Sequence, residues 1–113
     1  MGVEAINSGR TAVISLHDKL MGGVETRELR ETTYKLISDE IVNVVLDLSN
    51  VQWVNSAGIG TILACYTSLI NRNGQLKLAC VTDKVQSLLT ITRLINIFEV
   101  YDTVEDAIKS FGT

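Results

Sequence analysis

Residues 41–63 have the sequence IVNVVLDLSNVQWVNSAGIGTIL, and the first eight form a nearly continuous apolar run. Such a run is typical of a strand buried on both faces in the middle of a parallel sheet. After Asn55 the apolar spacing changes to that of one helix face, formed by Ile59, Ile62, Leu63, Tyr66, Leu69 and Ile70. The segment therefore predicts a central strand followed by an amphipathic helix, which ends at Asn73-Gly74.

The flanking segments continue this alternation of strands and helices. Before the central strand we expect an edge strand over residues 3–6, a turn at Asn7-Ser8-Gly9, a strand over residues 11–17 and a helix over Val24–Ser38. After the central helix we expect a strand at residues 76–80, a short helix around residues 85–89, a strand over residues 97–101 and a final helix capped by Thr103. This order predicts an α/β fold with a mainly parallel sheet.

In open α/β sheets, functional groups gather where the C-terminal ends of strands meet the N-termini of helices. Two turns occupy such positions in this sequence, residues 21–23 and residues 55–60. We therefore expect the functional site at these two turns.

Composition limits the class of protein. The 113 residues, 46% of them hydrophobic, predict one core and a single domain over residues 1–113. The formal net charge of -3 and the scattered Lys and Arg residues argue against nucleic acid as a partner. We find neither a secretory signal nor an apolar run of about 18 residues, so we expect a cytoplasmic chain without membrane insertion.

Several isolated residues have ordinary structural explanations. Cys65 and Cys80 lie 15 positions apart in apolar stretches without a CxxC spacing, so we expect reduced core thiols and no metal site. We expect Trp53 in the core and His17 on the surface at a strand end.

Ser56 lies directly after the central strand and directly before the helix. Its hydroxyl could cap the free N–H groups of the first helical turn, which is a purely structural role. Gly58 and Gly60, however, are costly within a helix, by about 0.5 to 1 kcal/mol each relative to alanine. Their presence predicts a close approach at the helix start, either by another backbone segment or by a ligand or partner protein.

Two kinds of catalytic or cofactor site fit this turn poorly. Gly58-Ile59-Gly60 matches the opening of a GxGxxG nucleotide-binding loop, but position 63 is leucine and no Lys-Ser/Thr pair follows. A hydrolase elbow of the GxSxG type would need glycine where Val54 stands. We therefore expect no enzyme activity and no cofactor, with a small nucleotide-binding domain as the weakest alternative.

The sequence resembles the STAS domains of bacterial anti-sigma factor antagonists. The resemblance rests on Asp47-Leu48-Ser49 and on Val54-Asn55-Ser56-Ala57-Gly58-Ile59-Gly60-Thr61-Ile62-Leu63, which is similar to the family signature DLS…DSSGLGxLL. Residues 85–89 and 97–107 are also typical of the family, so the similarity covers nearly the whole chain. It implies a single mixed sheet of four to five strands, with about four helices packed mainly on one face.

The resemblance also implies a function. In this family the serine at the position of Ser56 is phosphorylated by an anti-sigma factor serine/threonine kinase, and the unphosphorylated antagonist binds that kinase and frees the sigma factor. A metal-dependent serine phosphatase would be the second partner, and a weak homodimer is left open. The implied partner-binding surface consists of Met21, Gly22, Gly23, Asn55, Ser56, Ala57, Gly58, Ile59 and Gly60.

Two positions depart from the family pattern, and each lacks an acid. Asn55 stands where the motif usually has aspartate, and Met21 follows Leu20 where a second aspartate is common. Either change could alter how a kinase places the Ser56 hydroxyl or could reduce repulsion toward a phosphate. A constitutive interaction module in a signalling or transport complex, without phosphorylation, is therefore the alternative function.

Overall fold

A computed structural model describes residues 1–6 and 10–111. The elements in chain order are β1 (Gly2–Ile6), β2 (Thr11–Leu20), α1 (Val24–Ser38), β3 (Asn43–Val54), α2 (Ser56–Ile70), β4 (Gln75–Ala79), α3 (Asp83–Ile91), the 3₁₀ turn η1 (Leu94–Asn96), β5 (Glu99–Tyr101) and α4 (Val104–Lys109). The alternation expected from the sequence is confirmed, and helix α1 has the predicted bounds. The predicted turn at Asn7-Ser8-Gly9 lies outside the described residues.

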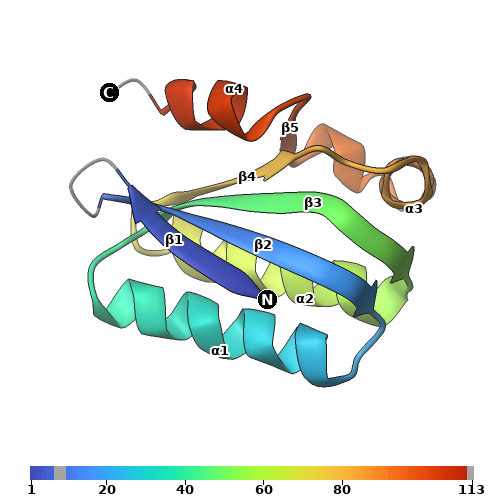
Figure 1. The fold of residues 1–113 in the computed structure, drawn as a ribbon, viewed down its shortest axis with the longest axis horizontal. Helices are drawn as coiled ribbons and strands as arrows, with labels where there is room; N and C mark the ends of the chain where they lie inside the picture. Colours follow the sequence, from blue (N-terminus) through green and yellow to red (C-terminus); the bar gives the residue numbers. More distant parts are fainter. Residues whose placement is uncertain (7–9, 112–113) are drawn as a thin grey trace.

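The sheet is mixed, with strand order β1-β2-β3-β4-β5 (Figure 1). β1 pairs antiparallel to β2, and the other neighbouring strands are parallel. Strands β2 and β3 are both longer than predicted, because they stay paired through two register shifts as far as Leu20 and Val54. Polar residues such as Asp18, which has a positive φ of 63°, interrupt the apolar pattern near the end of β2. The apolar pattern alone therefore does not predict how far the strand extends.

The helices cover the sheet unequally. Figure 1 shows α1 and α2 on one face of the sheet and α4 on the other, with α3 beside the end of β3. The larger core lies under α1 and α2 and includes Leu29, Leu46 and Ile62, all fully buried. Ala107 of α4 covers a smaller cluster on the opposite face. The predicted arrangement, with helices mainly on one face, is confirmed.

In the second half of the chain, apolar spacing alone predicts the burial of some residues and the bounds of one strand wrongly. Ile97 is 45% exposed and lies outside β5, which is shorter than the predicted strand because η1 takes up part of the connection. Ile70, expected on the buried face of α2, is 44% exposed in the last turn of that helix. The predicted Thr103 cap is confirmed, since its Oγ1 accepts a hydrogen bond from the Asp106 N–H at 3.1 Å.

Candidate functional site

The end of β2 and the start of α2 form a tight junction at the C-terminal edge of the sheet. The backbone N–H of Asn55 donates to the Leu20 carbonyl at 3.3 Å. The Asn55 side chain accepts a hydrogen bond from the Gly58 N–H at 3.1 Å and donates through Nδ2 to the Met21 carbonyl at 3.5 Å. The two turns that the sequence analysis selected therefore contact each other through Asn55.

Asn55, and not Ser56, caps helix α2. Asn55 has an extended backbone and supplies the cap oxygen, while Ser56 is the first residue within the helix. The Ser56 side chain is exposed, and within the part of the chain that the structure describes its hydroxyl makes no hydrogen bond. The prediction of a Ser56 cap was wrong by one residue, because Ser and Asn are both good caps and stand side by side here.

This assignment gives a stability test at adjacent positions. Asn55→Ala removes the cap and should lower the free energy of unfolding by about 1 kcal/mol. Ser56→Ala removes no hydrogen bond and should change it by less than about 0.5 kcal/mol. Urea unfolding followed by circular dichroism measures both variants, and an equal loss in the two would contradict the assignment of the cap.

The two glycines of α2 have different surroundings. A Cβ atom at Gly58 would lie 1.9 Å from the Leu20 carbonyl oxygen, so the absence of a side chain lets β2 and α2 approach each other. A Cβ atom at Gly60 would meet nothing within 4 Å, and Gly60 is exposed. Gly58 therefore serves internal packing, whereas Gly60 leaves bare backbone on the surface one helical turn after Ser56.

Exposed apolar side chains lie along the same edge of the molecule. Met21 in the β2–α1 turn is 46% exposed, and Val24 at the start of α1 is 60% exposed. Trp53, near the end of β3, is 49% exposed, so its predicted core position was wrong. The Lys84 ammonium lies 3.8 Å from the centre of the Trp53 ring and covers part of it. Trp53 lies outside the core because it belongs to the end of β3 that extends beyond the buried run.

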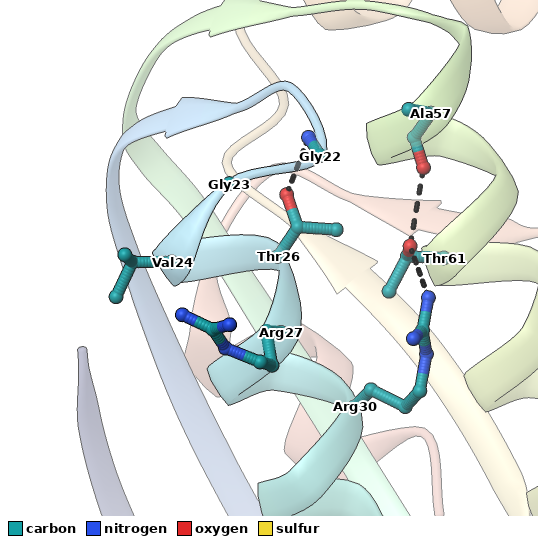
Figure 2. Close-up of a pocket in the computed structure, with 8 residues that line it drawn as sticks. All are labelled: Gly22, Gly23, Val24, Thr26, Arg27, Arg30, Ala57 and Thr61. Carbon is teal, nitrogen blue, oxygen red and sulfur yellow. Dashed lines mark hydrogen bonds between the residues drawn. The ribbon is translucent and has the colours of Figure 1, made fainter.

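A recess of about 390 Å³ lies between α1 and α2 beside this junction (Figure 2). Its lining includes Gly22 and Gly23 from the β2–α1 turn, and Gly22 has the left-handed backbone that favours glycine, with φ of 91°. Arg27 and Arg30 of α1 and Ala57 and Thr61 of α2 line it as well.

A short chain of hydrogen bonds joins the α1 side of the recess to its α2 side. Arg30 donates through Nη2 to the Thr61 hydroxyl at 3.3 Å, and that hydroxyl donates to the Ala57 carbonyl at 3.1 Å (Figure 2). Neither arginine was predicted as a site residue from the sequence. Their spacing of three on a predicted helix directly after Gly22-Gly23 was the signal that could have drawn attention to them.

The remaining candidate residues are placed as follows. His17 is exposed in β2, as predicted. Cys65 is buried and Cys80 half-buried, both as free thiols, and desolvation raises the pKa of each. Among residues 1–6 and 10–111, no three His, Cys, Asp or Glu side chains are grouped as a metal site would require. No helix in this same part of the chain is long and apolar enough to span a membrane.

Known proteins share both sequence and fold with this chain. Over 80 residues it is 30% identical to a candidate anti-sigma factor antagonist of Thermotoga maritima, which covers 66% of this chain and 71% of that protein. Over 66 residues it is 32% identical to the anti-sigma F factor antagonist of Paenibacillus polymyxa, which covers 58% of this chain and 56% of that protein.

Three solved structures show the extent of the shared fold. The anti-sigma factor antagonist SpoIIAA in its unphosphorylated form superposes with a TM-score of 0.76 at 18% identity, covering 99% of this chain and 98% of that one. The phosphorylated form of SpoIIAA from Bacillus gives 0.78 at 18% identity, with 97% of both chains covered. A sulfate transporter family protein from Wolinella succinogenes gives 0.75 at 18% identity, covering 86% of this chain and 80% of that one.

A family model describes what the antagonists and the transporter protein have in common. The model of the STAS domain matches residues 3–107, which include both the α2 junction and the C-terminal half. The chain therefore belongs to the STAS domain family.

Proposed function

We propose that this protein is an anti-sigma factor antagonist that binds an anti-sigma serine/threonine kinase while Ser56 is unphosphorylated and is released when Ser56 is phosphorylated. The observation that carries the proposal is that Ser56 is exposed at the first position of α2 and its hydroxyl is not used as the cap. The relatives named as antagonists support the same role. A metal-dependent serine phosphatase would restore the binding form, and we place this cycle in the cytoplasm.

The helix start suits a group that changes its charge. A phosphate on Ser56 adds about -1.5 to -2 charge and three acceptor oxygens, and a helix N-terminus favours negative charge through its dipole and free N–H groups. Because Asn55 and not Ser56 accepts the hydrogen bond from the Gly58 N–H, a phosphate on Ser56 displaces no capping hydrogen bond of the free protein. Phosphorylation of Ser56 can therefore change the affinity for the kinase without changing the fold of the free protein.

The surroundings of Ser56 also suit a protein partner. Met21, Val24 and Trp53 expose apolar area that a partner could cover, and Gly60 leaves room for close contact with backbone. We propose the following contact residues for the kinase: Met21, Gly22, Gly23, Asn55, Ser56, Ala57 and Gly60. Gly58 and Ile59, which the sequence analysis included, are buried and support this surface from below.

Asn55 in place of the usual acid does not remove the structural role of that position. Asparagine and aspartate cap helices about equally well, and the amide additionally donates to Met21, which a carboxylate could not do. The difference between asparagine and aspartate that would affect kinase binding is the missing negative charge. This leaves a constitutive interaction module in a signalling or transport complex as the second candidate, and a sulfate transporter family protein has the same fold.

Phosphate mapping separates the two candidates. The purified chain is incubated with Mg-ATP and an anti-sigma serine/threonine kinase from the same genome, and the modified residue is located by mass spectrometry. We expect one phosphate, on Ser56, and none on the Ser56→Ala variant. Asn55→Asp serves as the matched control for the missing acid. Kinase binding without phosphate on Ser56, in the native chain and in Asn55→Asp alike, would favour the constitutive module.

A further inference from the structure

The recess between α1 and α2 contains two cationic side chains without an anionic partner. Arg27 and Arg30 both line it (Figure 2), and within the described part of the chain neither guanidinium forms an ion pair. The chain as a whole has a formal net charge of -3, so this concentration of positive charge contrasts with its average.

The position of the pair is unfavourable for the isolated protein. Arg27 lies in the first turn of α1, where the helix dipole disfavours a cation. Figure 2 shows its guanidinium on the Val24 side of α1, whereas that of Arg30 points toward Thr61 of α2. Helix α1 also begins at Gly23 without a side-chain cap. Glu25 supplies one negative charge in the same turn, and the positive potential that the two arginines add along the recess favours an anion there.

The geometry of Arg30 prepares it for a planar anion. Its Nη2 atom is held by the Thr61 hydroxyl, which restricts the orientation of the guanidinium, and a guanidinium presents two parallel N–H groups to a carboxylate. Ala57, on the opposite wall, directly follows Ser56 in the chain. The recess therefore borders the residue that we propose is phosphorylated.

We infer that the recess is the anion-binding part of the docking surface. It receives an aspartate or glutamate side chain of the partner protein. The inference rests on the proposed function and adds the chemistry of the partner, which must present a carboxylate beside the point where it approaches Ser56.

A small probe tests the recess without the kinase. The dipeptide N-acetyl-Glu-Glu-amide is titrated into ¹⁵N-labelled protein, with N-acetyl-Gln-Gln-amide as the neutral control and inorganic phosphate as a third arm. We expect the Nε–Hε resonances of Arg27 and Arg30 to shift with the acidic peptide, while those of Arg10 and Arg72 stay in place. A response to phosphate alone would indicate a small-anion site and overturn the inference, as would no response.

Kinase affinity then tests the role of the recess in the complex. The Arg27→Gln/Arg30→Gln variant should bind the kinase about 30-fold more weakly or worse, with a smaller dependence on salt. Arg10→Gln/Arg72→Gln removes the same charge at distant exposed positions and should bind like the native chain. Native affinity in the first variant overturns the inference while phosphorylation of Ser56 still stands. A peptide response together with an unmodified Ser56 overturns the proposed switch instead.

Discussion

Replacing Gly58 by alanine is expected to destabilise the protein by about 2 kcal/mol, although alanine is the better helix former. The helical preference alone would favour alanine by about 1 kcal/mol. The new methyl group, however, would lie 1.9 Å from the Leu20 carbonyl oxygen and 2.7 Å from its carbon. These are backbone atoms paired within the sheet, so they cannot turn aside as a flexible side chain could. Overpacking of this kind costs about 1 to 3 kcal/mol or more, and it outweighs the helical gain.

Gly60 provides the matched control within the same helix. Alanine there meets no atom within 4 Å, so Gly60→Ala should raise the free energy of unfolding by up to about 1 kcal/mol. The two variants thus differ in sign, and for a chain of this length each 1 kcal/mol corresponds to a change of about 4 °C in Tm. Thermal unfolding followed by circular dichroism measures both. Stabilisation by Gly58→Ala would show that β2 and α2 are not held together as described.

The fold could be predicted because its central elements obey simple periodicities. The apolar run of β3 and the amphipathic spacing of α1 and α2 each identify one kind of element, and their order leaves few ways to form a sheet. Prediction failed at the ends of the elements. The register shifts that carry β2 to Leu20 depend on pairing with β3, and pairing between strands leaves little trace in the residues of one strand.

The site was predicted in position but not in detail. Chain order alone places the turns at residues 21–23 and 55–60 on one edge of a parallel sheet. The choice between Asn55 and Ser56 as the cap depends on where the helix begins, and an error of one residue exchanges their roles. Trp53 and the Arg27–Arg30 pair were missed for another reason. Whether they face the core, solvent or a recess depends on elements that are distant in sequence.

Ser56→Asp should weaken binding to the kinase by about 10²-fold or more, which corresponds to about 2.7 kcal/mol. A carboxylate at this position must lose its water when the partner covers it, and without a matching cation that loss is costly. The free variant should unfold no more easily than the native chain, because a negative charge in the first turn of α2 is favoured by the helix dipole by about 0.3 to 1 kcal/mol. Calorimetric titration with the kinase, alongside thermal unfolding of each variant, separates loss of binding from loss of fold.

Two further variants assign the effect to charge. Ser56→Asn has nearly the shape of Ser56→Asp without its charge, and Ser56→Ala removes the hydroxyl. If the dianion of a phosphate controls the complex through desolvation, Ser56→Ala should bind like the native chain and Ser56→Asn should lie close to it, because only Ser56→Asp carries charge into the interface. Equal weakening by Ser56→Asn and Ser56→Asp would attribute the effect to side-chain size, and phosphate would then act by steric exclusion. Full affinity in Ser56→Asp would contradict control by charge at this helix start.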